Sequence, residues 1–221
     1  DVVRADEAEP LVPGPVTEAG VIENPGVYEL QNDIDLGGQA IAAFEIKLSD
    51  VVLDGNGYTI SNGTSEAIHI LASGDGNALE NVTITNLTIT NTETAISAMN
   101  VQNSAFTNLE LVSNHDAGLV FAGNGGQLNL VDNVLFEGNE KGIFLREGTS
   151  GMTIQNSRFI ENHEVAIKAS GSSNHDILNN YFEGQDGEKV IHLTGRSPDT
   201  EIRGNEITAS KGPEYAVQVG G

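Results

Sequence analysis

Cysteine and tryptophan are absent from this chain of 221 residues, and only ten residues are Lys or Arg. Without cysteine the chain has no disulfide bond, no thiolate nucleophile and no thiolate metal ligand. No apolar run approaches ~18 residues, so the sequence predicts no membrane-spanning helix. No stretch keeps an apolar face at helical spacing for three turns, which argues against helical repeats. The core must therefore come from another kind of structure.

The scarcity of positive charge is matched by an excess of acid. Asp and Glu number 32 against ten Lys and Arg, which gives a net charge of −22. Sequence-independent binding of nucleic acids and of anionic membranes needs cations, so both are excluded. Such a charge repels itself at low salt, but at about 1 M salt the screening length falls to ~3 Å. We therefore predict an extracellular or cell-surface location in a high-salt environment, with an acidic protein of an ordinary habitat as the alternative. The start at Asp1 instead of Met fits either a processed secreted protein or a cut fragment.

A short apolar motif recurs through the chain at nearly constant spacing. The steps between copies are 28, 23, 24, 24, 24 and 26 residues. The second residues of the copies are Ile68, Ile96, Leu119, Ile143, Ile167, Ile191 and Val217. A fixed period in this range indicates stacked supersecondary units, none of which can bury its apolar face alone. Because the repeated segments are β-branched and alternate with period two, we predict an all-β parallel β-helix (a solenoid) of about seven regular turns.

A second column of the repeat combines apolar residues with asparagine. Its asparagines are Asn86, Asn108, Asn133, Asn156 and Asn179. Asn tolerates the left-handed backbone of a corner, and stacked amides can bond one another from turn to turn. We therefore predict a structural, inward-facing Asn ladder. The apolar residues of the same frame predict an inner stack of Ile89, Leu111, Phe136, Phe159, Phe182 and Ile207.

The regular period does not cover the whole chain. Residues 1–20 carry three of the six prolines and five acids, which predicts a mobile tail or linker. Residues 21–60 break the period and are expected to form an N-terminal cap with the first turns, while residues 61–221 form the β-helix repeats. Asn62, Asn81 and Asn86 begin N-glycosylation sequons. Asn62 and Asn81 are the candidate sites, because Asn86 belongs to the presumed inward column.

Three segments near the start carry a resemblance to a known family. They are Asn24–Leu30 (NPGVYEL), Asp33–Ile34 and Ser49–Ile60 (SDVVLDGNGYTI). They resemble the opening of right-handed parallel β-helix repeat proteins of archaeal and bacterial surfaces, within the pectin-lyase-like superfamily, and the resemblance extends over roughly residues 21–219. It implies a right-handed, single-stranded β-helix. It does not choose a function, since this superfamily includes lyases, hydrolases, adhesins and structural proteins.

The outward-facing columns carry no stacked set of catalytic residues. Polysaccharide-cleaving enzymes need paired carboxylates on neighbouring turns, or acids that bind calcium beside a basic residue. No outward column holds acids on consecutive turns, and the triplets Asn114–Asp116 and Asn174–Asp176 fall at different places in the repeat. Arg158, Tyr181 and Lys168 could cluster to bind an acidic sugar, but scattered solvent-facing residues are the favoured interpretation. The sequence thus predicts no catalytic residue and favours a non-enzymatic protein.

One corner of the repeat carries an unbroken column of acids. In the last six copies, the residue three positions before the second motif residue is acidic: Glu93, Asp116, Glu140, Glu164, Glu188 and Glu214; the first copy has Ser65 there. At ~4.8 Å between turns, neighbouring like charges cost just under ~1 kcal/mol per contact in water. The column is expected to be either a solvated acidic ladder or a weak site for Ca²⁺ or monovalent cations. No other cofactor is predicted.

The last motif copy falls on the last residues of the sequence. Val217, Gln218 and Val219 form a regular strand there, and an exposed parallel edge is a template for further pairing. Either the sequence is a fragment of a longer chain, or another subunit covers this edge. The leading hypothesis is a structural or adhesive building block that assembles head to tail into filaments. The alternative is a carbohydrate-binding or polysaccharide-cleaving module of the pectin-lyase-like type.

Overall fold

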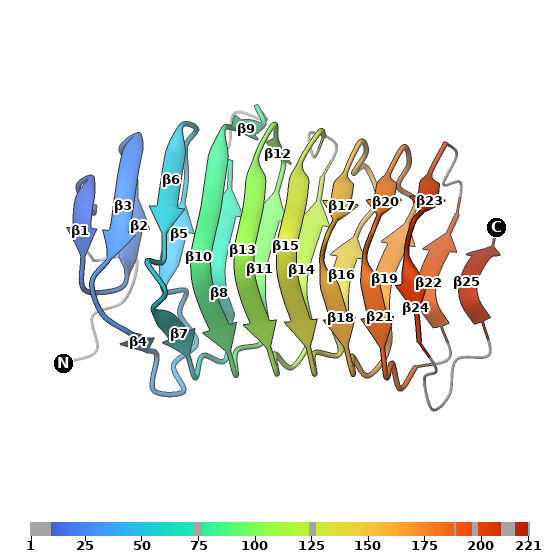
Figure 1. Ribbon diagram of the computed structural model, residues 1–221. Coiled ribbons are helices and arrows are strands. Elements are labelled where there is room, and N and C mark those ends of the chain that lie inside the picture. The colour runs from blue at the N-terminus through green and yellow to red at the C-terminus, as the bar shows by residue number, and fades with distance from the viewer. Residues whose placement is uncertain are drawn as a thin grey trace.

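All of the strands run along one elongated coil, in which each turn of the chain lies beside the next (Figure 1). The computed structural model describes residues 10–72, 77–123, 127–187, 189–195, 199–208 and 215–220. In this part of the chain every pair of neighbouring strands is parallel and no helix occurs. The prediction of an all-β, right-handed parallel β-helix is confirmed.

One face of the coil is a sheet of nine strands, with one strand from each successive turn. Its order is β2 (Gly20–Ile22), β5 (Phe44–Ile46), β8 (Glu66–Leu71), β11 (Thr94–Met99), β14 (Ala117–Ala122), β16 (Lys141–Leu145), β19 (Val165–Ser170), β22 (Lys189–Thr194) and β25 (Tyr215–Gly220). The apolar motif forms these strands from β8 onward, and its second residues pair with one another in register. The recurring motif therefore marks equivalent positions on consecutive turns.

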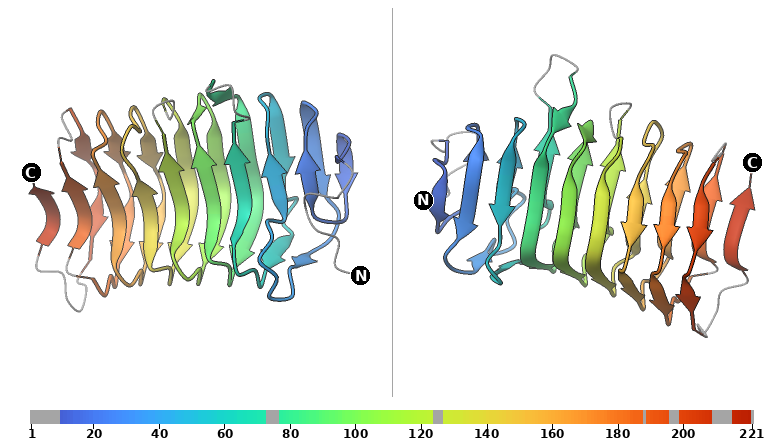
Figure 2. Two further views of the ribbon diagram at one scale, coloured as in Figure 1. Left: turned by 180° about the vertical axis from the view of Figure 1, so that it is seen from behind. Right: turned by 45° about the horizontal axis from the view of Figure 1, so that its top comes forward.

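The opposite face is a sheet of 14 strands, called here the long sheet. Its main path is β1 (Gly14–Val16), β3 (Gly26–Leu30), β6 (Val51–Asp54), β10 (Val82–Thr90), β13 (Ala105–Val112), β15 (Leu130–Glu137), β17 (Thr153–Gln155), β20 (Asp176–Leu178) and β23 (Glu201–Arg203). Beside this path lie β4 (Ile34–Asp35), β7 (Thr59–Ser61), β18 (Arg158–Ile160), β21 (Tyr181–Glu183) and β24 (Glu206–Ile207). The short strands β9 (Leu79–Glu80) and β12 (Val101–Gln102) form a separate pair at the edge of the coil (Figure 2).

The core lies between the two faces and runs along the axis as columns of like side chains. Phe136, Phe159 and Phe182 are fully buried and paired in register, and their rings stack with centroids 4.7 and 4.8 Å apart. Leu111 continues this column on the preceding turn. The predicted inner stack is confirmed for these residues. Ile207 is 36 % exposed, because β24 lies at the end of this column in the part described and pairs with β21 alone.

The asparagines of the predicted ladder lie at a bend of the long sheet. All five have a positive φ, between 50° and 56°. The left-handed backbone was thus predicted correctly, but the inward direction was wrong: the five side chains are exposed. Only Asn133 donates to the amide of another member, Asn108, at 2.8 Å, whereas Asn86 and Asn156 donate to Asp54 and Asp132. The column fixes the bend by backbone conformation more than by amide pairing.

Buried amides form a ladder at another corner. The backbone N–H of Asn114 donates to Asn139 Oδ1 at 2.9 Å, that of Asn139 to Asn162 Oδ1 at 3.2 Å, and that of Asn162 to Gln185 Oε1 at 3.3 Å. All four side chains are at most 1 % exposed. The side-chain amides also donate to main-chain carbonyls across the interior, as Asn139 does to Leu111 at 2.8 Å. This buried ladder satisfies the polar backbone where the chain turns inside the molecule.

The N-terminal segment is more regular than predicted. Within residues 10–20, which were expected to belong to a tail, β1 pairs with β3 and Leu11 forms a parallel bridge with Ile22. Residues 1–9 lie outside the described residues. β5 and β6 already pair in register with β8 and β10, so the regular coil starts before residue 61. Among the described residues, no helix has the length and apolar character needed to cross a membrane.

Candidate functional site

The acidic column forms one corner of the coil, at the start of the strands of the nine-stranded sheet. Glu93, Asp116, Glu140 and Glu164 stack there, and the N–H of Asp116 donates to the carbonyl of Glu93 at 2.7 Å. Glu188 and Glu214 lie outside the described residues. No group of three or more His, Asp or Glu among the described residues could hold a metal ion. Cation binding along this column stays a prediction.

Two lysines neutralise part of this column. Lys141 Nζ lies 2.8 Å from Asp116 on the preceding turn and 3.0 Å from Glu164 on the following turn. Lys168 Nζ lies 2.8 Å from the other oxygen of Glu164. Burial favours the neutral acid, but the hydrogen bonds from Lys168 and Lys141 hold the pKa of Glu164 below its ordinary value. Glu164 therefore stays charged and holds the two ammonium groups in place.

The same turns carry an outward column of a different character. Phe144, Lys168 and His192 occupy equivalent positions on β16, β19 and β22. The Lys168 ammonium lies 5.4 Å from the centre of the Phe144 ring, and the Arg146 guanidinium lies 5.0 Å from it. Both distances fall within the range of cation–π attraction. An aromatic ring and two cations are thus held together on the outside of the sheet.

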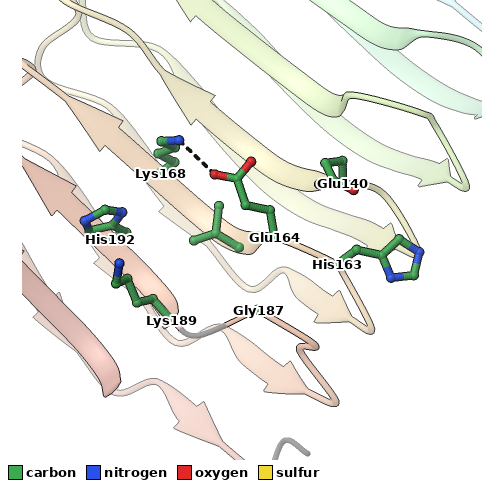
Figure 3. Close-up of a pocket in the computed structure, with 8 residues that line it drawn as sticks. Glu140, His163, Glu164, Lys168, Gly187, Lys189 and His192 are labelled. Atoms are coloured by element: carbon green, nitrogen blue, oxygen red, sulfur yellow. Dashed lines mark hydrogen bonds and ion pairs between the residues drawn. The ribbon is translucent and has the colours of Figure 1, made fainter. Parts of the chain in front are cut away.

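A half-open pocket of about 400 Å³ adjoins this column (Figure 3). Its walls are Glu140, His163, Glu164, Val165, Lys168, Gly187, Lys189 and His192. The side chains of Lys168 and His192 come from neighbouring strands, while Gly187 comes from the corner that precedes β22. A Cβ at Gly187 would overlap with the carbonyl of Glu164, so glycine allows the two turns to approach closely here.

The electrostatics of the pocket favour a neutral histidine beside cations. Burial, followed by the charges of Lys189 and Lys168, lowers the pKa of His192, and the charge of Glu164 opposes this only in part. At neutral pH the imidazole is therefore uncharged and can both donate and accept a hydrogen bond. Lysine ammoniums, a neutral imidazole and an aromatic ring together suit a ligand that carries both negative charge and apolar C–H surface.

The comparisons with known proteins agree with this fold. A family model described as "Right handed beta helix region" matches residues 44–217. The chain belongs to this family. None of the curated proteins compared with this right-handed β-helix matches it.

Solved structures are similar to this chain at low sequence identity. The enzymatically active domain of tailspike protein 2 of bacteriophage CBA120 is 12 % identical, with a TM-score of 0.54; the alignment covers 88 % of this chain and 38 % of that one. The A-module of the mannuronan C-5 epimerase AlgE4 of Azotobacter vinelandii is 14 % identical, with a TM-score of 0.36 and coverage of 93 % and 83 %. The β-helix described here thus spans well under half the length of the tailspike domain.

The other predicted site residues are not brought together in the same way. Arg158 lies 5.9 Å from the Tyr181 ring on the long sheet, whereas Lys168 belongs to the nine-stranded sheet, so the three residues do not form one cluster. The candidate glycosylation residues Asn62 and Asn81 are exposed, and their amides donate to Asp35 and Asp50. Their modification stays a prediction.

One signal for the surface beside the pocket is present in the sequence itself. Phe144, Lys168 and His192 stand in one outward column of the repeat, and they can be aligned without a structure. The ion pairs of Lys141 and the burial of His175 could not be inferred from the repeat. Lys141 follows Glu140 in the sequence, yet its ammonium pairs with acids of the two neighbouring turns. His175 stands in what reads as a turn, yet it is fully buried.

Proposed function

We propose that the chain binds an acidic polysaccharide on the outer face of β16, β19 and β22. The observation that carries this proposal is the gathering of cations on these three strands, two of them beside the Phe144 ring. In a chain of net charge −22, four of the ten basic residues lie on or next to these three strands: Lys141, Arg146, Lys168 and Lys189. A carboxylated sugar would pair its charge with Lys168 and Lys189 and place its C–H face near the ring.

The arrangement of the cations supports a polymer as the ligand. Arg146, Lys168 and Lys189 belong to consecutive turns, which are ~4.8 Å apart along the axis. A polymer that lies along the axis meets a new cation at each turn, whereas a small anion meets only part of the set.

Replacement of Lys168 by Gln tests the proposed site. We expect the affinity for a polyuronate, measured by isothermal titration calorimetry, to fall about tenfold, because one charge-assisted contact is lost. Lys189→Gln should act in the same direction. Lys47→Gln is the matched control: it removes the same charge near β5, at the far end of the same sheet, and should leave the affinity unchanged.

Two results would contradict the proposal. One is equal weakening by Lys47→Gln and Lys168→Gln, which would mean that only net charge matters. The other is equal binding of a neutral glucan and a polyuronate. The same samples, followed by ultraviolet absorbance for an unsaturated uronate product, report whether the bound polymer is also cleaved.

A second candidate, a surface or matrix building block that assembles end to end, rests on the apolar surface of β25. Val217 and Val219 continue the inner columns of Ile191 and Leu193, yet they are 37 % and 70 % exposed. In this proposal the first turn of a second copy covers them, in an extracellular, high-salt setting that screens the repulsion between the acidic copies.

Light scattering of concentrated protein in about 1 M salt tests the assembly, since screening is nearly complete there. We expect the mean mass to rise with concentration, and Val219→Asp to abolish the rise by placing a charge on the contact surface. Met99→Asp is the control, because Met99 is 37 % exposed on β11, in the middle of the coil and away from both ends. A stable monomer under these conditions would refute end-to-end assembly.

A further inference from the structure

A third column of side chains runs through the interior at the corner before β13, β15, β17, β20 and β23. Its members precede residues that pair in register: Ser104, Asn129, Met152, His175 and Thr200. In this column a backbone N–H repeatedly donates to the side chain of the next turn. Ser104 donates to Asn129 Oδ1 at 3.0 Å, Met152 to His175 Nδ1 at 3.3 Å, and His175 to Thr200 Oγ1 at 3.4 Å.

The imidazole of His175 is an unusual member of this column. It is fully buried, and its Nδ1 accepts from the N–H of Met152, so the ring proton must be on Nε2. Nε2 has no hydrogen-bond partner. Ser172 Oγ, three residues earlier in the same bend, is likewise buried without a partner. Among the described residues, three buried side-chain polar atoms have no hydrogen-bond partner, and two of them lie between β19 and β20.

We infer that His175 is an acid-sensitive latch, whose protonation releases the C-terminal turns of the coil from β20 onward. A proton on Nδ1 removes the acceptor of the Met152 N–H and places a positive charge in the apolar interior. A buried charge without a partner costs several kcal/mol, so the bend opens instead and lets water reach the ring. Since each turn of a solenoid contacts only its neighbours, the turns that follow can separate without unfolding of the rest.

The charged groups around His175 do not offset this charge. Asp176 follows it on β20, Asp199 and Glu201 flank Thr200 on the next turn, and Glu147 lies in the bend of the preceding turn; all four are exposed. Burial is the one cause of the shift that lowers the pKa of His175 to about 4. In an unfolded segment the same imidazole titrates near ~6.5. Between these values the opened state binds the proton and the closed state does not, so closure is favoured above this window and lost as the pH falls through it.

The latch would also control the proposed binding site. β22, which carries Lys189 and His192, belongs to the turn that begins at His175. Lys168 lies on β19, just before the bend. Opening at His175 would therefore separate the two halves of the pocket. This consequence depends on the proposed function, whereas the acid-dependent opening does not.

Hydrogen exchange of the intact chain, followed by mass spectrometry and corrected for the intrinsic exchange rate, tests the latch. We expect the opening constant for peptides within 176–194 to rise about 30-fold between pH 8 and pH 5, the ratio set by the two pKa values. Peptides from β5 to β11 should keep their protection. His175→Asn should abolish the change, because Asn129 shows that asparagine fits this column and accepts the same kind of bond.

The exposed His163 provides the matched control, and His163→Asn should keep the full pH dependence. If His175→Asn is too unstable to purify, His175→Gln offers an alternative acceptor. The unaltered chain also tests the inference, because its acid-induced exchange must be confined to the turns that follow His175. Acid-induced exchange that is spread evenly over all turns, or that persists in the variant, would overturn the inference. Loss of polysaccharide binding with no change in exchange would also contradict it, while leaving the binding site itself in place.

Discussion

Phe159→Ala should lower the free energy of unfolding by about 3–5 kcal/mol, the cost typical of removing a buried phenylalanine. The ring is fully buried and is stacked on both sides, at 4.7 Å from Phe136 and 4.8 Å from Phe182. Neighbouring turns are held by strand pairing, so they cannot collapse into the space left behind. Truncation therefore loses the transfer energy and also leaves a cavity.

Urea denaturation followed by far-ultraviolet circular dichroism measures this change. Phe159→Leu should cost less, since it keeps most of the apolar volume. Phe144→Ala is the contrasting control, because that ring lies on the outer face and its removal opens no internal cavity. An equal loss for Phe144→Ala and Phe159→Ala, or a loss below about 1 kcal/mol for the latter, would mean that the stacked column does not carry the stability assigned to it.

The period of the repeat was enough to predict the architecture. Ile143, Ile167 and Ile191 are 24 residues apart, and they pair in register on consecutive strands. In a solenoid, equal spacing in sequence becomes vertical stacking, so one-dimensional alignment yields the contacts directly. The same alignment could not give the depth of a side chain at a corner. Asn133 and Asn139 both recur with the period, yet the first is exposed and the second is fully buried.

The candidate site was only partly predictable for a related reason. Alignment places Phe144, Lys168 and His192 in one outward column, which is information about the sheet. It does not describe how long side chains reach across turns. Lys141 pairs with acids on both neighbouring turns, and the corner at Gly187 closes against Glu164. How far a side chain reaches across turns, and how closely a corner approaches the next turn, do not recur with the period of the repeat. Only the three-dimensional structure shows them.

The buried position of Asn139 gives the second large expected effect. Its Oδ1 accepts from the backbone N–H and the side-chain amide of Asn114, both at 2.9 Å, and its Nδ2 donates to the carbonyl of Leu111 at 2.8 Å. Asn139→Leu keeps the approximate volume but leaves these groups buried without partners. At ~1–3 kcal/mol for each unsatisfied group, we expect a loss on the order of 5 kcal/mol.

Asn133→Ala is the matched comparison, since it removes an asparagine six residues away on the same turn. Asn133 is exposed with a φ of 56°, so its replacement should cost only ~1–2 kcal/mol from the left-handed backbone. Asn133→Gly should restore most of that loss, because glycine adopts this conformation without strain. Glycine at position 139 should give no such recovery, since there the amide itself is required. Equal losses for Asn133→Ala and Asn139→Leu in urea denaturation would mean that the two columns stabilise the coil in the same way, and the buried amides would have no special role.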